Sequence, residues 1–236
     1  MRLGALVLPA LLAGACVEPH TGNRSSRWCH APDGVSTVVD DMEDGDASLC
    51  GPAAGSPAGT WQMVFTPGAP AATISPGAGP LSQSVPLPAA DMVGVLAQST
   101  RALELSGSGF TQASNASASL VAQFAAPVDL TTFSSVQFWA LADRAAYIRF
   151  NVATAADPPS GARWGQPVPL GTSWAHVVMP LAQLAMGFGA SPTLDLTAAT
   201  GLEFRYTYFV EGISGSADQA NVGTFDIWID DVQLTP

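Results

Sequence analysis

The 236-residue chain carries 19 acidic residues and 8 basic residues, all of them arginine, for a formal net charge of −11. Because phosphate binding depends on clustered Lys and Arg, this balance predicts no nucleic-acid partner. Hydrophobic residues make up 47% of the chain, which excludes a mainly disordered protein. With 23 Gly and 19 Pro, backbone breaks are too frequent for a helical bundle and favour short strands joined by turns.

The first 16 residues predict an export signal. Arg2 supplies a positive charge, and residues 3–15 form an apolar run too short to span a bilayer. Residues 12–16, Leu-Ala-Gly-Ala-Cys, resemble a bacterial lipobox, although Ala13 stands where that motif usually has a larger aliphatic residue. The resemblance implies that Cys16 is acylated and becomes the first mature residue. Cleavage near Ala15 without a lipid is the alternative.

Both interpretations take the protein out of the cytoplasm. A lipid on Cys16 would place it in the cell envelope, and the lack of an aspartate after that cysteine favours the outer membrane. Signal cleavage without a lipid would leave an extracellular protein. Contact with a membrane is expected through the N-terminal lipid alone.

Two further cysteines, Cys29 and Cys50, flank an acidic segment. In an exported chain, the economical interpretation is one disulfide bond between them. Two unpaired thiols are the alternative. A zinc site has little support because the sequence has no CxxC or HxxxH spacing.

Residues 17–36 are polar and aperiodic, which predicts a tether, and residues 37–236 are expected to form one domain. Residues 67–91 are rich in Pro, Gly and Ala and predict a long surface excursion, and residues 181–186 predict a helical turn. The expected strands share β-branched and aromatic residues bounded by turn residues. They begin at Ser36 and continue at 60–65, 102–106, 118–124, 135–141, 147–153, 175–179, 201–210 and 224–234. This number of short strands predicts an all-β, two-sheet jelly-roll sandwich.

Alternation along two of these strands separates an apolar side from a polar side. In 147–152 the apolar side carries Phe150, and the polar side carries Tyr147, Arg149 and Asn151. In 201–208 the apolar side carries Phe204 and Tyr206, and the polar side carries Glu203 and Arg205. If both strands share a sheet, its outer face can hydrogen-bond hydroxyl groups and offers a ring to a sugar. A solvated face with weak ion pairs is the alternative.

Six segments together resemble the family 11 carbohydrate-binding modules and their galactose-binding-like jelly-roll relatives. The opening segment, 38–46, reads Val-Val-Asp-Asp-Met-Glu-Asp-Gly-Asp, and the closing segment, 225–234, reads Phe-Asp-Ile-Trp-Ile-Asp-Asp-Val-Gln-Leu. Between them lie 101–110, 133–143, 147–152 and 173–184, in the order that such modules show. The resemblance covers about residues 36–236 and implies a non-catalytic sugar-binding domain.

The resemblance also implies a structural calcium ion between the first and last strands. It points to Glu43 and Asp230 as the first ligands, with Asp41 and Asp231 behind them. The residue chemistry agrees, because Ca²⁺ prefers oxygen ligands and crowded carboxylates repel one another without a cation. Acidic turns that are left solvated are the alternative.

By the same resemblance, the sugar site lies on the concave sheet. The implied ligand-binding residues are Tyr147, Arg149, Asn151, Glu203, Arg205 and Trp139, with Trp164 as a further candidate. Trp139 is included because it alternates away from Phe138. Only three tyrosines occur in the chain, so the identity of the glycan, and whether one binds, stay open.

No enzyme is predicted. The three histidines are His20, His30 and His176, and the sequence has neither a Gly-x-Ser-x-Gly elbow nor a Gly-rich phosphate loop. The leading hypothesis is therefore an exported, lipid-anchored module that binds a polysaccharide. A structural or adhesive envelope lipoprotein that binds a protein is the alternative, a glycan hydrolase is a third hypothesis, and the sequence does not give the oligomeric state.

Overall fold

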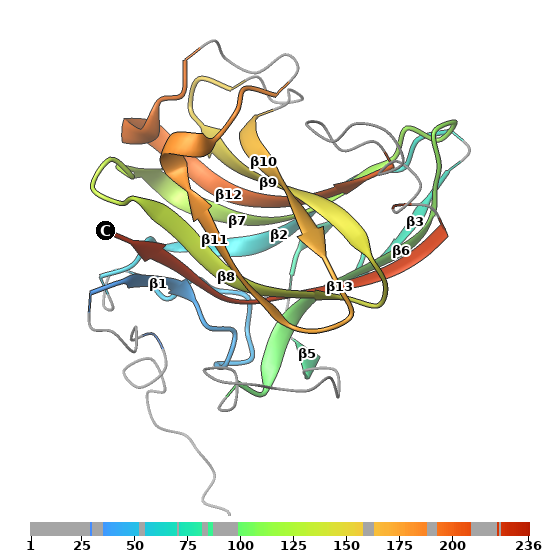
Figure 1. Cartoon of the computed structure of the whole chain (residues 1–236). Coiled ribbons are helices and arrows are strands. Elements are labelled where there is room, and N and C mark those ends of the chain that lie inside the picture. The colour runs from blue at the N-terminus through green and yellow to red at the C-terminus, as the bar shows by residue number, and fades with distance from the viewer. Residues whose placement is uncertain are drawn as a thin grey trace, which may run out of the picture.

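The computed structural model describes most of the chain from residue 35 onward (Figure 1). The described residues are 29, 35–51, 55–69, 71–81, 85–86, 99–157, 163–187, 193–208, 221 and 223–236. The predicted signal with Cys16 and most of the tether lie outside them. Within the described part, no helix is long and apolar enough to cross a membrane.

Two antiparallel sheets form the two layers of the molecule (Figure 1). The seven-stranded sheet, called sheet A below, has the order β11-β8-β13-β6-β3, with β1 paired to β13 and β5 paired to β6. Its strands are β1 (Thr37–Asp40), β3 (Thr73–Ser75), β5 (Val85–Pro86), β6 (Arg101–Phe110), β8 (Ser135–Ala142), β11 (Ala175–Pro180) and β13 (Gly223–Thr235).

The six-stranded sheet, called sheet B below, has the order β10-β9-β12-β7-β2-β4. Its strands are β2 (Gly59–Thr66), β4 (Gly79–Pro80), β7 (Ser117–Val128), β9 (Ala146–Thr154), β10 (Trp164–Leu170) and β12 (Ala199–Thr207). Two short 3₁₀ turns, η4 (Leu181–Gln183) and η5 (Leu196–Ala198), complete the described elements. The predicted jelly-roll sandwich is confirmed.

Aromatic side chains from both sheets meet in the core. The ring centroid of Phe204 lies 4.9 Å from that of Phe138 and 5.5 Å from that of Phe150. Tyr206 is fully buried and stacks on Phe225 at 3.7 Å. Rings of this size bury large apolar areas, and their edge-to-face contacts add about 1 kcal/mol each. The inward direction predicted for Phe150, Phe204 and Tyr206 is confirmed.

The observed elements differ from the predicted ones in two places. Strand β10 was not expected, and β3, β4 and β5 lie within the segment 67–91 that was predicted to be a surface excursion. The predicted helical turn at 181–186 corresponds to η4. These differences fall at the edges of the sheets. There, a segment becomes a strand because a neighbouring strand is available for pairing, and its own sequence pattern matters less.

Candidate functional site

The polar sides of β9 and β12 lie next to each other on the outer face of sheet B. The two strands pair antiparallel, with Asn151 directly opposite Glu203 and Arg149 directly opposite Arg205. Side chains that are directly opposite share one face of a sheet. Phe150 and its partner strand's Phe204 point into the core, so these four side chains point away from it. The sequence prediction that both strands share one sheet is confirmed.

Glu203 is held by three side chains. Ser119 Oγ on β7 donates to Glu203 Oε1 at 2.7 Å, and Asn151 Nδ2 donates to Oε2 at 3.0 Å. Arg163 Nη1 lies 3.1 Å from the same Oε2 and forms an ion pair with it. The carboxylate is therefore fixed in orientation, and its charge is balanced by Arg163.

Arg149 continues this network toward the edge of the sheet. Its Nε donates to Asn151 Oδ1 at 3.0 Å. Its Nη2 donates to the carbonyl oxygens of Gly165 at 3.1 Å and Ala185 at 3.2 Å. Together these three acceptors orient the guanidinium.

Three of the predicted ligand-binding residues are buried instead of exposed. Arg149 is 7% exposed, Asn151 is 1% exposed and Glu203 is 6% exposed. Alternation correctly gave their direction from the sheet, but it carries no information about what packs over them. Tyr147 and Arg205 are partly exposed and remain open to a ligand.

Trp139 does not lie on this face. It belongs to β8 of sheet A and points outward there, since its neighbour Phe138 is in the core. Its ring centroid lies 5.0 Å from that of His176 on β11. The six predicted residues therefore do not form a single site, because the tryptophan lies on the opposite face of the sandwich. Trp164 packs partly against the core.

The sequence did not point to several members of the network. Ser119 could have been found, because it alternates away from the buried Leu120 in a predicted strand. Arg163 and Ala185 lie outside the predicted strands and carry no such signal. Buried Asn221 was also missed, and its Nδ2 donates to the carbonyl oxygens of Tyr147 at 2.8 Å and Thr207 at 2.7 Å.

A second constellation joins the loop after β1, the chain entering β6 and strand β13, which are neighbours in sheet A. Ser99 Oγ lies 3.0 Å from Glu43 Oε1, 2.5 Å from Asp230 Oδ2 and 3.3 Å from the carbonyl oxygen of Arg101. A hydroxyl carries a single proton, so it cannot satisfy three acceptors at once. The Glu43 and Asp230 carboxylates thus meet at Ser99, where three acceptors share one hydroxyl proton.

The Glu43 carboxylate is oriented by residues 99–101. Oε1 accepts hydrogen bonds from the backbone N–H groups of Thr100 at 2.7 Å and Arg101 at 2.9 Å, and Oε2 accepts one from Thr100 Oγ1 at 2.7 Å. Asp230, which has no exposed surface, accepts from the backbone N–H of Asp231 at 2.8 Å. Both carboxylates are therefore fixed by strand β13 and by the chain entering β6.

Burial raises the pKa of Asp230 to about 8, and the nearby charges of Asp231 and Glu43 act in the same direction. The hydrogen bond from Ser99 opposes this shift. A carboxylate in this environment is stabilised either by a proton or by a cation. The oxygen-rich donor set of Glu43, Asp230 and the Arg101 carbonyl fits a hard cation such as Ca²⁺.

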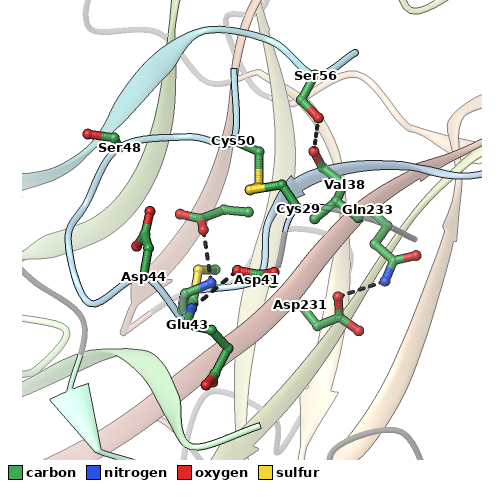
Figure 2. The surroundings of a disulfide bond; sticks show 12 residues. Cys29, Val38, Asp41, Glu43, Asp44, Ser48, Cys50, Ser56, Asp231 and Gln233 are labelled. Atoms are coloured by element: carbon green, nitrogen blue, oxygen red, sulfur yellow. Dashed lines mark hydrogen bonds between the residues drawn. A yellow bond between two sulfur atoms is a disulfide. The ribbon is translucent and has the colours of Figure 1, made fainter. Parts of the chain in front are cut away.

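The other two predicted metal ligands, Asp41 and Asp231, each accept a hydrogen bond of their own. Asp231 Oδ1 accepts from Gln233 Nε2 at 2.6 Å, and Asp41 Oδ1 accepts from the Glu43 backbone N–H at 3.2 Å (Figure 2). An Asp41 oxygen also lies within 4.8 Å of the sulfur atoms of Cys29 and Cys50. Those sulfurs are bonded to each other, so they are not metal ligands.

The predicted disulfide is confirmed. Cys29 and Cys50 are bonded, with Cα atoms 5.6 Å apart and a sequence separation of 21 (Figure 2). The backbone N–H of Cys50 donates to the carbonyl oxygen of Val39 at 3.0 Å. The bond therefore fastens residue 29 to the loop that carries Asp41 and Glu43.

Neither a protein-family model nor a curated protein sequence matches the chain. Solved structures do match it. A family 11 carbohydrate-binding module from Clostridium thermocellum, in complex with a β-1,3-1,4-mixed-linked tetrasaccharide, aligns with TM-score 0.55 and 16% identity over 85% of this chain and 95% of that chain. The same family's module of the C. thermocellum cellulosomal cellulase Lic26A-Cel5E aligns with TM-score 0.56 and 16% identity, over 85% and 94%. The fold is that of the family 11 carbohydrate-binding modules.

Within this carbohydrate-binding-module fold, the two constellations occupy different sheets. The polar network lies on the outer face of sheet B, and the carboxylate pair joins the loop that follows β1 to strand β13 of sheet A. The first consists of hydrogen-bonding groups on a β-sheet surface, and the second of carboxylate oxygens held by hydrogen bonds.

Proposed function

We propose that this protein is a non-catalytic glycan-binding module whose ligand lies on the outer face of sheet B. The observation that carries the proposal is the row of polar side chains that β9 and β12 place opposite each other, in a fold shared with carbohydrate-binding modules. A sugar needs directed hydrogen bonds for its hydroxyls and a ring for its apolar face. Arg205 and Tyr147 supply both kinds of contact and are partly exposed.

The buried members of the network have a positioning role in this proposal. Asn151 and Glu203 are buried on the same face as the partly exposed side chains and hold each other and Arg149 in one geometry. A fixed surface loses less conformational entropy when a ligand binds than a mobile one does. Substitution of Glu203 is expected to disturb both folding and binding, so it cannot show whether the side chain itself contacts the glycan.

Binding is tested with an array of plant, algal and bacterial polysaccharides, followed by titration calorimetry on any glycan that is retained. Tyr147→Ala and Arg205→Ala are expected to weaken binding at least tenfold, about 1.4 kcal/mol each. Trp139→Ala, on the opposite face, is the matched control and should bind normally. Unchanged affinity in both sheet B variants would reject this face as the site. If no glycan binds and an envelope protein is captured instead, the protein-binding alternative is favoured.

The proposal includes a structural calcium ion held by Glu43, Asp230 and the Arg101 carbonyl. The ion would balance the two converging carboxylates and tie the loop after β1 to β13. It has no part in chemistry at the glycan-binding face, which lies on the other sheet. Asp41 and Asp231 remain candidates for residues that bind the calcium ion through a bridging water molecule.

The proposal also places the protein outside the cytoplasm, anchored by a lipid on Cys16. The support is the sequence pattern of residues 1–16 together with a disulfide, which persists in oxidising compartments. Labelling of cells with a tagged fatty acid is expected to mark the wild-type protein and not Cys16→Ser. Equal labelling of the two would reject acylation at this cysteine.

A further inference from the structure

The outer face of sheet A carries a strip of large apolar and aromatic side chains. Trp139 and Leu141 on β8, and Trp228 on β13, alternate with residues of the hydrophobic core and therefore point away from it. On the neighbouring strand β11, His176 lies directly opposite Trp139, and Val178 is 49% exposed. These five residues are called the sheet A strip below.

The strip is packed within itself. Leu141 is 3% exposed even though it points away from the core. Trp228 is its cross-strand partner, and Trp139 stands two residues before it on the same face. These large neighbours shield Leu141 from water, and both tryptophans remain partly exposed. Side chains that are already held in place lose little conformational entropy when a partner binds, and Trp is enriched among the residues that dominate protein interfaces.

Carboxylates border the strip on the side of β6. Glu104 lies directly opposite Trp228, and Asp226 stands two residues before Trp228 on the same face. Both acidic side chains are partly exposed. Burial raises the pKa of Glu104, and the nearby charge of Asp226 adds to that rise. Among the residues that the structure describes, no group forms a hydrogen bond or an ion pair with the Glu104 side chain.

This border is anionic. Burial and the charge of Asp143 raise the pKa of Asp226, and the charge of Arg144 opposes that rise. Arg144 also lies 3.7 Å from Asp143, with which it forms an ion pair. Within the described part of the chain, one arginine thus stands beside three carboxylates, those of Glu104, Asp143 and Asp226. A cation from outside the chain would balance the excess.

We propose that the sheet A strip docks a basic segment of a partner protein, with an arginine or lysine side chain placed over Trp228 and paired with Glu104. A cation over an indole ring is the strongest contact of its kind, and the carboxylate beside the ring adds an ion pair. Apolar residues of the segment would pack on Trp139 and Val178. The inference does not depend on the glycan-binding function proposed for sheet B.

Charge complementarity favours this occupant over two others. A second copy of the chain would bring the same carboxylates to a symmetric contact, where like charges repel. An uncharged glycan would leave the Glu104 carboxylate without a cation. The strip and its border span four neighbouring strands, β11, β8, β13 and β6, which is roughly 15 Å across. That width suits a short segment better than a whole domain, whose interface would bury about 800 Å² on each side.

The test uses an array of short synthetic peptides in which arginine and leucine recur at different spacings. Each peptide has a counterpart in which citrulline replaces arginine, which keeps the shape and removes the charge. A chitosan oligosaccharide presents ammonium groups on a glycan instead. Probes retained by the array are titrated calorimetrically at low salt and at about 0.3 M salt, where exposed charges are more strongly screened.

Two variants remove the proposed contacts and one is a matched control. Glu104→Gln removes the carboxylate, and Trp228→Leu removes the ring while keeping an apolar side chain. Asp129→Asn removes one negative charge from an exposed position after β7 of sheet B. Thermal unfolding midpoints report whether each variant is folded. If Trp228→Leu is unfolded, Glu104→Arg takes its place and should abolish binding.

The expected result is that an arginine peptide binds at least about tenfold more tightly than its citrulline counterpart and that salt weakens this binding. Glu104→Gln and Trp228→Leu should each lose about tenfold in affinity, while Asp129→Asn binds normally. Backbone amide shifts on addition of the peptide should concentrate on β13 and β6.

Three results would overturn the inference, and none of them bears on glycan binding by sheet B. An equal loss in Glu104→Gln and Asp129→Asn would show a general attraction between a basic peptide and an acidic protein. Retention of no arginine peptide would reject a basic protein segment as the occupant. Binding of the chitosan oligosaccharide with loss in Glu104→Gln, without binding of any peptide, would reassign the strip to an amine-bearing glycan.

Discussion

Asp40 is a buried carboxyl group at the end of β1. Its Oδ2 accepts a hydrogen bond from Trp61 Nε1 at 2.6 Å, and its Oδ1 accepts one from the backbone N–H of Met42 at 2.9 Å. Burial raises the pKa of Asp40 well above its usual value, and the two hydrogen bonds only partly oppose that rise. Since the unfolded carboxyl loses its proton at about pH 4, this group favours unfolding as the pH rises.

Asp40→Asn is therefore expected to change how stability depends on pH. In the wild type, the contribution of Asp40 to the free energy of unfolding decreases from about pH 4 upward, until the folded carboxyl also ionises. Asn cannot ionise, so the variant should show a smaller decrease over the same range. The free energy of unfolding of both proteins is measured by denaturant titration at a series of pH values, with a metal chelator in the buffer. Asp46→Asn, an exposed change in the same loop, is the control, and parallel curves for wild type and Asp40→Asn would contradict the expectation.

Predictions for single residues succeeded where they concerned the direction of a side chain from the sheet, because the strand backbone alone sets that direction. Alternation identified Phe150 and Phe204 as core and Asn151 and Glu203 as outward, because direction from a sheet has a period of two. It failed on exposure, since Asn151 is 1% exposed. Exposure depends on segments distant in sequence, such as the one that carries Arg163.

At the scale of elements, β10 is a strand that the sequence pattern did not predict. This strand contains Pro167 and Pro169, and proline is normally evidence against a strand. It lies at the edge of sheet B, where missing N–H donors are tolerated. The longer strands β7, β9 and β13 were predicted from their β-branched and aromatic content, because their pattern is unbroken by such residues over most of their length.

Gly165 lets β10 approach β9 closely enough for Arg149 to reach its carbonyl. A Cβ atom there would collide with the Phe150 carbonyl oxygen and with Asn151 Oδ1. Gly165→Ala is expected to cost about 1–3 kcal/mol of unfolding free energy, because the backbone must shift. Gly171→Ala, where an added Cβ meets nothing within 4 Å, is the control and should cost far less. If Gly165→Ala and Gly171→Ala unfold at the same denaturant midpoint, the close approach of β10 to β9 is contradicted.

At the scale of the whole molecule, the loop after β1 is fastened in two ways, to the last strand and to residue 29. The Glu43 and Asp230 carboxylates meet at Ser99, and the Cys29–Cys50 disulfide closes the same loop. The resemblance to known modules predicted this meeting of the chain ends, and the disulfide followed from cysteine number and compartment. The role of Ser99 was not predictable, because no local pattern connects it to residues that lie far along the chain.

Calcium is expected to stabilise the protein through this junction. A concentration 100 times the dissociation constant would add about 2.7 kcal/mol to the free energy of unfolding. Glu43→Gln and Asp230→Asn should each remove most of that gain, because each takes away an anionic ligand. Glu104→Gln, on the outer side of β6, should keep it. Thermal unfolding in chelator and in excess calcium measures the effect, and a midpoint that does not respond to calcium would exclude the site.

The most direct test of glycan recognition by sheet B is a map of where a bound glycan lies. Backbone amide shifts of the isotope-labelled protein are recorded while the glycan retained on the array is added. The expected result is a set of shifts concentrated on β9 and β12 around Tyr147 and Arg205, with little change near Trp139. Shifts concentrated instead on the outer face of sheet A, around Trp139 and His176, would contradict the assignment of the glycan to sheet B.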